Sequence, residues 1–427
     1  MRVEVLPSVL SGRVAAPGSK SDAQRIVACA LLARGKTVIR AFPDNDDCNA
    51  ALQVAQDLGA VVTRTGDVVT VKGGFPQAFA SGIRNPKNTI DCGESGLASR
   101  MFMAIASLFE EPITIKGHST LLDRPFDDLL DALSGNGVRV ESVDGCLPIT
   151  VCGPLRGGAI TLNASVSSQY LTGLLIAASR AAEPTTITVA DLKSKPYVGL
   201  TVQVLRRFGV DITHNDGFSE FHVQPKAITG VDITVPGDWS GAAFLLVAGA
   251  LCAESGITVD NLDSESAQAD RVILDVLKLA GVRVEIAESS VSVWESEIQA
   301  FEFDATDCPD LFPPLAVLAA FANGVCVIKG AGRLMHKESN RAKVIQQEFA
   351  KASVRIVVRD DEMKIYPSAI RRAEMLSHRD HRIAMAAAVM GLAGDHVTVK
   401  QAESVSKSFP GFFASLTALQ ARIQIVN

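Results

Sequence analysis

The fold of this chain is decided by a short stretch, Lys36-Thr37-Val38-Ile39, whose alternation is typical of a half-buried β-strand. Five similar stretches follow it at intervals of about 70 residues, a long spacing for one structural repeat. They are Pro112-Ile113-Thr114-Ile115, Thr186-Ile187-Thr188-Val189, Gly256-Ile257-Thr258-Val259, Val325-Cys326-Val327-Ile328 and His396-Val397-Thr398-Val399. Six copies of one sequence pattern predict a fold that is built from six similar units.

A glycine marks a second landmark in four copies, where a helical segment gives way to a final pair of strands. The four stretches are Leu58-Gly59-Ala60-Val61, Asn136-Gly137-Val138-Arg139, Phe208-Gly209-Val210-Asp211 and Ala280-Gly281-Val282-Arg283. In the fifth copy, Ala352-Ser353-Val354-Arg355 stands at that place without the glycine. Each copy also begins with a polar cluster that leads into an apolar segment, such as Phe244-Leu245-Leu246-Val247-Ala248, and this pattern predicts a helix buried on all sides.

The six copies form two sets of three, because the turn signal Pro236-Gly237 falls between the third and the fourth copy. A chain of 427 residues also exceeds the size of one ordinary core. We therefore expect an α/β (α+β) fold of two lobes, each with three units, with helices inside and sheets outside. The N-terminal lobe is predicted to comprise residues 18–235, and the C-terminal lobe is predicted to contain residues 236–427.

Composition and charge argue against several functional classes. The formal net charge of -6 comes from well-mixed charges and gives no basic stripe for a nucleic acid. The eight cysteines include no CxxC pair, so we expect neither a zinc site nor a disulfide framework. No apolar stretch is long enough to span a bilayer, and Met1-Arg2-Val3-Glu4-Val5 does not resemble a signal peptide. We expect a cytoplasmic protein without nucleic-acid or membrane partners.

Polar residues at the openings of the first three units suit anion binding. Pro17-Gly18-Ser19-Lys20-Ser21, with Arg25, offers backbone N–H groups, hydroxyls and two cations at the start of a helix. The second and third openings, Cys92-Gly93-Glu94-Ser95-Gly96 and Ser167-Ser168-Gln169, also combine hydroxyls with a helix start. Each opening taken alone also fits ordinary N-capping, so both interpretations remain open at this point.

Three further clusters place cations beside acids: Asp123-Arg124-Pro125, His336-Lys337-Glu338-Ser339-Asn340-Arg341 and His378-Arg379-Asp380-His381-Arg382. The alternative for each is a solvated ion-pair network on the surface. The cations nevertheless gather at equivalent openings and loops: Lys20, Arg25, Arg100, Arg124, Lys337, Arg341, Arg382 and Lys407. Their convergence would create an electropositive site for phosphorylated or carboxylated metabolites.

At these residues the chain resembles the 5-enolpyruvylshikimate-3-phosphate synthase family, over essentially its whole length. The matching pieces are Pro17-Gly18-Ser19-Lys20-Ser21 with Arg25, Asp123-Arg124-Pro125, Ser167-Ser168-Gln169, Ser194-Lys195-Pro196-Tyr197, Pro309-Asp310, Lys337-Glu338-Ser339-Asn340-Arg341, Asp380-His381-Arg382 with Met385, and Lys407-Ser408-Phe409-Pro410. They occur in the order of the family and at about its spacing. The resemblance implies two lobes of three βαβαββ units each. It also implies that residues 1–17 join the C-terminal lobe, which closes over phosphoenolpyruvate.

The resemblance implies an enzyme of chorismate and aromatic amino acid biosynthesis. The family transfers the enolpyruvyl group of phosphoenolpyruvate to the 5-hydroxyl of shikimate 3-phosphate and releases phosphate, without a metal or an organic cofactor. The reaction is an addition followed by an elimination, so it needs positioned acid–base groups and dense positive charge. We further expect a monomer that is inhibited by glyphosate.

The resemblance also assigns residues to the two substrates. Shikimate 3-phosphate would be bound by Lys20, Ser21, Arg25, Ser167, Ser168, Gln169, Ser194, Tyr197, Asp310 and Lys337. Phosphoenolpyruvate would be bound by Lys20, Gly96, Arg124, Gln169, Arg341, Arg382 and Lys407. Asp310 matches the base at the 5-hydroxyl, Glu338 matches the carboxylate near the methylene carbon, and Lys20 shares in proton transfer. Which carboxylate handles which proton stays open.

Five positions depart from the common pattern of the family. Ala23 and Gln24 replace Ser and Asn on the first helical turn, and Glu94 stands where many members have Asn. Arg333 falls where some members place an Asn on the substrate. Leu97 follows Gly96 in place of a small hydroxyl residue. It either weakens the binding of phosphoenolpyruvate and glyphosate or points into the core of the lobe.

Two other functions fit the sequence less well. A sister enzyme transfers enolpyruvyl to UDP-N-acetylglucosamine, but its opening reads Lys-Asn and its mobile loop carries a reactive cysteine. Here the opening reads Lys20-Ser21, and the loop from Gly117 to Arg124 has no cysteine. A non-catalytic anion-binding protein should have lost the acid–base groups, yet Asp310, Glu338 and Lys20 are all present.

Overall fold

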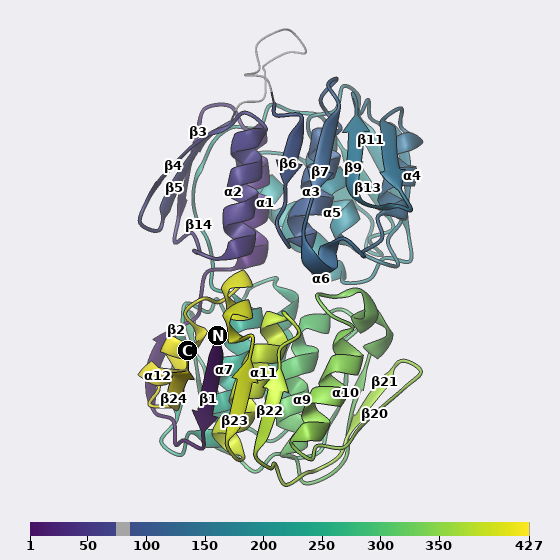
Figure 1. Ribbon diagram of the computed structural model, residues 1–427. Helices are drawn as coiled ribbons and strands as arrows, with labels where there is room; N and C mark the ends of the chain where they lie inside the picture. The colour runs from purple at the N-terminus through teal and green to yellow at the C-terminus, as the bar shows by residue number, and fades with distance from the viewer. Residues whose placement is uncertain (74–85, 427) are drawn as a thin grey trace. The chain divides into compact units, whose positions relative to one another are not determined.

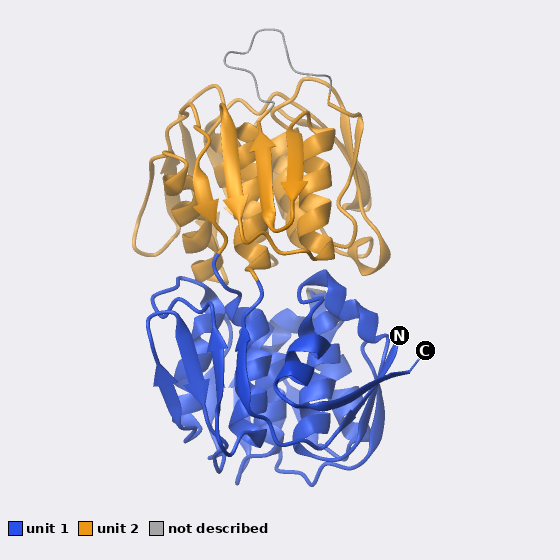
Figure 2. Ribbon diagram, turned by 90° about the vertical axis from the view of Figure 1, so that its left-hand side faces the viewer, with its two compact units in different colours: residues 1–17, 236–427 blue, residues 18–235 orange. Residues whose placement is uncertain are grey.

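The computed structural model describes residues 1–73 and 86–426 of the chain. These residues divide into two compact units, which are coloured separately in Figure 2. We call residues 18–235 the N-terminal unit, and residues 1–17 with 236–427 the C-terminal unit. Within its described residues, each unit combines three four-stranded sheets with a set of buried helices.

The N-terminal unit contains six α-helices among its described residues (Figure 1). They are α1 (Lys20–Leu32), α2 (Asp46–Asp57), α3 (Gly96–Ala106), α4 (Asp127–Ser134), α5 (Gln169–Ala178) and α6 (Lys195–Arg207), with the 3-10 turn η1 (Ser119–Leu121) before α4. The strands are β3 (Lys36–Arg40), β4 (Val61–Thr65), β5 (Val68–Lys72), β6 (Thr89–Asp91), β7 (Ile113–Lys116), β8 (Arg139–Val143), β9 (Cys146–Cys152), β10 (Gly158–Asn163), β11 (Thr185–Ala190), β12 (Ile212–His214), β13 (Glu220–Val223) and β14 (Asp232–Thr234).

The three sheets of this unit share one topology. Their strand orders are β14-β3-β5-β4, β6-β7-β9-β8 and β10-β11-β13-β12. In each sheet the second strand is one of the repeated Thr/Val/Ile stretches, and it pairs parallel with the first strand and antiparallel with the third. Because β14 is the last strand of the unit in sequence, the chain returns to complete the first sheet before it leaves the unit.

The C-terminal unit repeats this plan. Its helices are α7 (Trp239–Cys252), α8 (Ile273–Leu279), α9 (Phe312–Ala320), α10 (Arg341–Lys351), α11 (His381–Ala393) and α12 (Phe412–Ala418), with the 3-10 turns η2 (Ala269–Val272), η3 (Pro309–Leu311), η4 (Ala331–His336) and η5 (Ala402–Lys407). Its strands are β1 (Arg2–Leu6), β2 (Gly12–Ala15), β15 (Ile257–Asp260), β16 (Val284–Ile286), β17 (Ser290–Val293), β18 (Glu302–Asp304), β19 (Cys326–Lys329), β20 (Ile356–Arg359), β21 (Glu362–Ile365), β22 (Ala373–Leu376), β23 (Val397–Lys400) and β24 (Arg422–Val426).

The N-terminal strands complete two sheets of the C-terminal unit. The sheet orders are β16-β17-β15-β2, β18-β19-β21-β20 and β22-β23-β1-β24. Strand β2 pairs parallel with β15, and β1 lies antiparallel between β23 and β24. One sheet therefore joins strands from the two ends of the sequence, and another joins β2 to strands of the fourth repeat.

The core of each unit is formed by helices that are buried on nearly all sides. These central helices are α1, α3 and α5 in the N-terminal unit and α7, α9 and α11 in the C-terminal unit. Gly173 lets α5 approach α3 closely, since a Cβ at that position would lie 2.8 Å from the carbonyl oxygen of Arg100. The sheets cover the central helices, so the predicted fold class, with helices inside and sheets outside, is confirmed. In the part of the chain that the structure describes, we find no helix of the length and apolarity needed to cross a membrane.

Candidate functional site

The site is built first from the N-terminal end of α1. Ser19 caps this helix, because its Oγ accepts a hydrogen bond from the backbone N–H of Asp22 at 3.3 Å. Lys20 starts the helix, and its Nζ lies 3.0 Å from Oδ2 of Asp47, a residue of α2. Both side chains of this ion pair are largely buried, so the ammonium group is fixed at the end of α1.

Arg25 extends the same end of α1 toward α6. Its guanidinium donates hydrogen bonds to Thr201 Oγ1 at 2.9 Å, to the carbonyl of Ser21 at 2.7 Å and to the carbonyl of Tyr197 at 3.2 Å. Burial lowers the pKa of Arg25 to about 10, which still leaves the group charged at neutral pH. Three residues assigned to shikimate 3-phosphate, Ser21, Arg25 and Tyr197, are thus brought together.

Gly96, at the start of α3, lies under two arginine side chains. A Cβ at this position would come within 2.7 Å of Arg124 Nη1 and 2.9 Å of Arg100 Nη1. Arg100 Nη1 also donates to Gln169 Oε1 at 2.8 Å, and this contact joins α3 to the first residue of α5. The structure therefore brings together the predicted residues Gly96, Arg124 and Gln169, with Arg100 between them.

The serines of the third opening lie immediately before α5. The backbone N–H of Gln169 donates to Ser167 Oγ at 3.3 Å, and Ser168 occupies the N-cap position without a capping hydrogen bond from its side chain. Ser194 holds the equivalent place before α6 in a left-handed conformation with φ of 53°. All three serines therefore lie at helix starts, where backbone N–H groups favour an anion.

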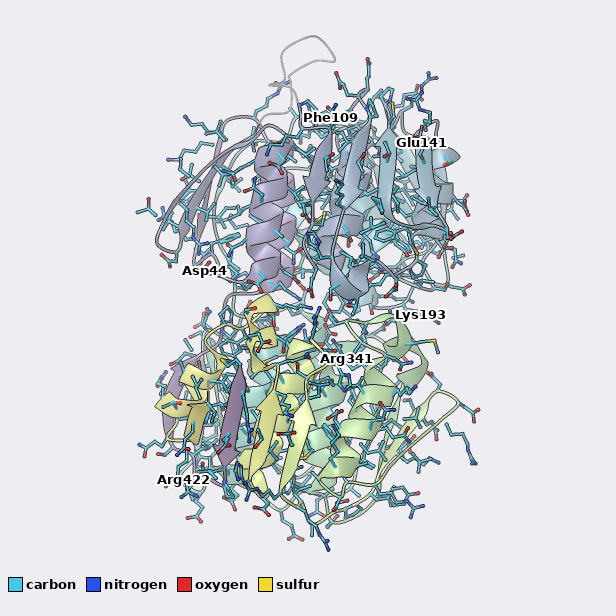
Figure 3. All side chains as sticks on the ribbon, viewed as in Figure 1. Asp44, Phe109, Glu141, Lys193, Arg341 and Arg422 are labelled. Carbon is cyan, nitrogen blue, oxygen red and sulfur yellow. The ribbon has the colours of Figure 1, made fainter. Side chains whose placement is uncertain are left out.

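In the C-terminal unit, Arg341 is the centre of a buried charge cluster. Arg341, which is labelled in Figure 3, begins α10. Its side chain has no exposed surface. Its Nη1 donates to Asp310 at 2.8 Å, its Nη2 to Glu338 at 2.5 Å and its Nε to Asp380 at 3.0 Å. In addition to Lys407, five of the predicted residues belong to this unit. Arg341 is one of them, and the other four contact Arg341 or one of its partners: Asp310, Lys337, Glu338 and Arg382.

Asp310 is the carboxylate of this cluster with the largest number of cationic partners. It lies 2.8 Å from Arg341, 3.0 Å from Arg382 and 3.5 Å from Lys337. Burial acts to raise its pKa, but Arg382, Lys337 and Arg341 together hold the pKa of Asp310 well below its usual value. Burial lowers the pKa of Lys337, although Asp310 opposes this effect. Asp310 therefore stays ionised while Arg382, Lys337 and Arg341 face it.

Lys407 is positioned by an unusual loop before α11. Its Nζ donates to the carbonyl oxygen of Arg379 at 3.0 Å. Arg379 and its neighbour His378 both have positive φ angles, 57° and 53°, which non-glycine residues seldom adopt. His378 Nε2 lies 2.8 Å from Oε1 of Glu348, a buried residue of α10. This contact ties the loop to the helix that begins with Arg341.

The structure shows the surroundings of three residues that depart from the family pattern: Leu97, Gln24 and Arg333. Leu97 is 7% exposed and belongs to the apolar core of the N-terminal unit, so the structure supports the core position among the two alternatives. Gln24 Oε1 accepts a hydrogen bond from Ser95 Oγ at 2.9 Å, which links α1 to the cap of α3. Arg333 Nη1 donates to the carbonyl of Thr306 at 2.5 Å.

Two of the carboxylates that hold the cations, Asp380 and Asp47, were assigned no role from the sequence. Asp380 is fully buried, accepts from Arg341 and caps α11 through the backbone N–H of Arg382 at 3.0 Å. Asp47 plays the corresponding part for Lys20. Asp380 stands directly before an apolar helical segment, a position typical of an N-cap residue. This position predicts a helix cap, but it does not predict that Asp380 is a partner of Arg341.

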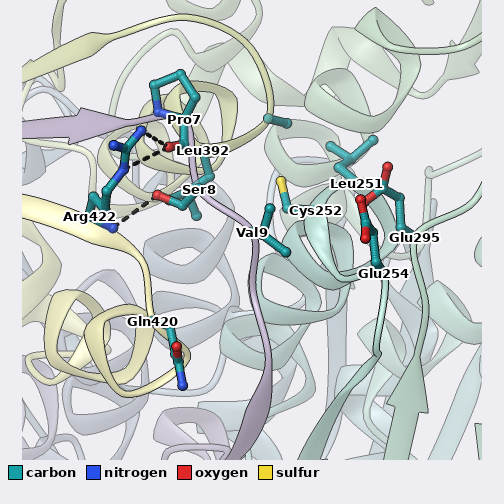
Figure 4. Close-up of a pocket in the computed structure, with 11 residues that line it drawn as sticks. Pro7, Ser8, Val9, Leu251, Cys252, Glu254, Glu295, Leu392, Gln420 and Arg422 are labelled. Atoms are coloured by element: carbon teal, nitrogen blue, oxygen red, sulfur yellow. Dashed lines mark hydrogen bonds between the residues drawn. The ribbon is translucent and has the colours of Figure 1, made fainter.

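A separate cavity of about 550 Å³ lies at the C-terminal ends of α7 and α11 (Figure 4). Cys252 and Leu392 line it, together with Ser8 and Arg422. Arg422 donates to the carbonyl oxygen of Pro7 at 2.5 Å. None of the predicted site residues lines this cavity, whereas Arg382 lies at the opposite, N-terminal end of α11.

A family model described as EPSP synthase (3-phosphoshikimate 1-carboxyvinyltransferase) matches residues 6–416. The chain belongs to the EPSP synthase family. Family members from Clostridium kluyveri and Methanocorpusculum labreanum, both named 3-phosphoshikimate 1-carboxyvinyltransferase, are 33% and 36% identical to it. Each alignment covers 99% of this chain, with 98% and 99% of the relative's own length. The family predicted from the motifs is therefore confirmed.

Two solved structures support the fold. EPSP synthase from Acinetobacter baumannii aligns over 100% of both chains with a TM-score of 0.82 and 24% identity. The enolpyruvyl transferase NikO from Streptomyces tendae aligns with a TM-score of 0.78 and 20% identity, over 99% of this chain and 98% of its own. At these identities the likeness concerns the fold, and it agrees with the six-unit architecture.

Proposed function

We propose that this chain transfers the enolpyruvyl group of phosphoenolpyruvate to the 5-hydroxyl of shikimate 3-phosphate, giving 5-enolpyruvylshikimate 3-phosphate and phosphate. The single observation that carries this proposal is the EPSP synthase family match over residues 6–416. The buried cations of both units support it, since two anionic substrates need several positive partners. The reaction is a step in the biosynthesis of chorismate and aromatic amino acids.

The proposed binding residues are divided between the two units. In the N-terminal unit, Arg25 and its neighbours at the starts of α1, α5 and α6 would bind shikimate 3-phosphate, and Arg124 would bind phosphoenolpyruvate. In the C-terminal unit, Arg341, Arg382 and Lys407 would bind phosphoenolpyruvate, and Lys337 would bind shikimate 3-phosphate. Helix starts and guanidinium groups both suit phosphate and carboxylate oxygens, which supports this division.

Asp310 is the proposed base for the 5-hydroxyl. Its pKa is held well below the usual value by Arg382, Lys337 and Arg341, and this makes it a weak base while those cations face it. Substrate anions would compete for the same cations and thereby raise the basicity of Asp310. Glu338, 2.5 Å from Arg341, is the proposed carboxylate near the methylene carbon, and Lys20 would share in proton transfer.

Phosphate release tests the proposed reaction. We expect release when the protein receives phosphoenolpyruvate with shikimate 3-phosphate and none with UDP-N-acetylglucosamine as acceptor. Asp310→Asn should lower kcat by about 10²-fold or more, because proton transfer by a positioned side chain contributes roughly that factor. Asp307→Asn, an exposed carboxylate three residues earlier, is the matched control and should keep full activity. Release only with the UDP-sugar, or no release at all, would contradict the proposal.

Three finer properties complete the proposal. Glyphosate is proposed to inhibit by competing with phosphoenolpyruvate, so its inhibition should weaken as the concentration of phosphoenolpyruvate rises. The chain is proposed to act as a monomer, and light scattering should give a mass near 45.2 kDa. The proposed location is the cytoplasm, which suits the free thiols of all eight cysteines. A dimer mass or inhibition that is independent of phosphoenolpyruvate would count against these points.

A further inference from the structure

The fourth repeat contains a buried carboxylic acid, Asp270, that contacts the start of the first helix of this repeat. Asp270 lies in η2, is 1% exposed and accepts a hydrogen bond at Oδ2 from Ser240 Oγ, in the first turn of α7. Its other oxygen, Oδ1, is buried and has no hydrogen-bond partner among the described residues. An ionised carboxylate with an unsatisfied buried oxygen is costly, so this environment favours the neutral acid.

The charges around Asp270 belong to the cluster of the C-terminal unit. Asp310 of η3 and Asp238, the N-cap of α7, both disfavour its ionisation, whereas Arg382 of α11 favours it. On its own turn, Arg271 donates to the carbonyl of Ser264. The charged side chains of the next helix, α8, are Asp275 and Lys278, and both are exposed.

Asp270 and Asp310 are pushed in opposite directions by these surroundings. Burial, followed by the charge of Asp310, raises the pKa of Asp270 to about 7. Arg382, Lys337 and Arg341 keep the pKa of Asp310 well below its usual value. Two neighbouring acids whose pKa values are pushed apart in this way have different roles: Asp310 remains an ion, whereas Asp270 keeps its proton below about pH 7.

We propose that Asp270 is held as a neutral carboxylic acid beside Arg382 and Asp310, and that it is a positioning residue which leaves the charge of Arg382 available to an anionic substrate group. This inference rests on the proposed function, because the anion is the phosphoenolpyruvate assigned to Arg382. An ionised Asp270 would compete for the guanidinium and would repel the incoming anion. A neutral Asp270 does neither.

The pH dependence of kcat/KM for phosphoenolpyruvate tests the role of Asp270. In the wild-type enzyme the neutral fraction of an acid with a pKa of about 7 falls about fivefold between pH 7 and pH 8. Asp270→Asn keeps the shape of the side chain and cannot ionise, so the ratio of kcat/KM in the variant to that in the wild type should rise about fivefold over this interval. Taking the ratio cancels the titration of phosphoenolpyruvate itself. Asp275→Asn, which alters an exposed carboxylate of α8, should give a constant ratio, and a constant ratio for Asp270→Asn would overturn the inference.

Ser240→Ala provides a second variant that leaves Asp270 in place. The Ser240 hydroxyl favours ionised Asp270, so its removal should move the fall of kcat/KM for phosphoenolpyruvate to higher pH. An unchanged midpoint, or a midpoint at lower pH, would contradict the inference.

A spectroscopic measurement separates this inference from the proposed reaction. With aspartate labelled at the carboxyl carbon with ¹³C, the signal that is missing in Asp270→Asn should titrate near pH 7. Titration below pH 5 would refute the neutral acid even if the enzyme is active. If the signal titrates near pH 7 but no phosphate is released with shikimate 3-phosphate, the proposed function fails and the neutral acid stands.

Discussion

Replacing Arg341 by methionine should destabilise the C-terminal unit more than any other single change in its charge cluster. Methionine has a long unbranched stem like that of arginine, so the substitution removes the guanidinium with little change in packing. It leaves Asp310, Glu338 and Asp380 close together without their common partner. Asp380 is fully buried and becomes an uncompensated charge.

The size of the effect follows from these contacts. Breaking a buried ion pair by removing one partner costs about 3–5 kcal/mol, because the other charge remains buried. Arg341 contacts three carboxylates, and its own side chain has no exposed surface. We therefore expect the free energy of unfolding of the C-terminal unit to fall by about 3–5 kcal/mol at pH 7.

Tryptophan fluorescence during urea unfolding measures this change selectively. The chain has two tryptophans, Trp239 and Trp294, and both lie in the C-terminal unit. The matched control is Lys329→Met, which removes one partner of the exposed ion pair with Glu302 and should leave the midpoint unchanged. An Arg341→Met variant that unfolds within about 1 kcal/mol of the wild type would refute the assignment of a buried, fully paired cluster.

The loss of unfolding free energy caused by Arg341→Met should also depend on pH in a defined direction. In the wild type the pKa of Asp310 is depressed, so this group adds stability above its unfolded pKa and loses it only as pH falls through the folded pKa. Without Arg341 the pKa of Asp310 rises, and protonation then relieves the repulsion among the carboxylates. The difference between variant and wild type should therefore be larger at pH 7 than at pH 5. A larger difference at pH 5 would contradict this reasoning.

Further substitutions test the surrounding contacts. Gly96→Ala should raise the KM for phosphoenolpyruvate severalfold and leave the urea midpoint unchanged, because the new Cβ would meet the movable ends of Arg124 and Arg100; an unchanged KM would count against this crowding. Leu97→Thr should lower the free energy of unfolding by about 1–3 kcal/mol with little effect on that KM, because Leu97 lies in the core; a large change in KM at constant stability would instead place it at the substrate. Glu348→Gln should cost about 1–3 kcal/mol in unfolding experiments, since Glu348 is buried against His378 and the backbone N–H of Leu376, whereas Lys351→Met at its exposed partner should change little.

The repeated strands could be predicted from the sequence because their signal is local. The stretch from Lys36 to Ile39 alternates between buried and exposed positions, and the structure extends it by one residue to Arg40. Strands β1 and β2 carry no comparable local signal for their partners. Arg2 lies opposite Lys400 and Val426 at the other end of the chain, so its pairing depends on the complete fold.

The cations of the candidate site could be predicted from the sequence, but only some of the carboxylates that hold them. Lys20, Arg25 and Arg341 stand in motifs near helix starts, where the sequence pattern points to anion binding. Asp47 and Asp380 become their partners only through packing between helices that are distant in sequence. Asp270 belongs to no motif, and its significance depends on burial and on the nearby Asp310, neither of which is encoded locally.

The most direct test of the central claim is the reaction in deuterated water with shikimate 3-phosphate and phosphoenolpyruvate. Addition followed by elimination delivers a solvent proton to the methylene carbon and then removes one from the resulting methyl group. The enolpyruvyl methylene of the product should therefore contain deuterium when it is examined by proton NMR and mass spectrometry. A product that forms without deuterium at that carbon would contradict the proposed enolpyruvyl transfer, as would the absence of an enolpyruvyl product.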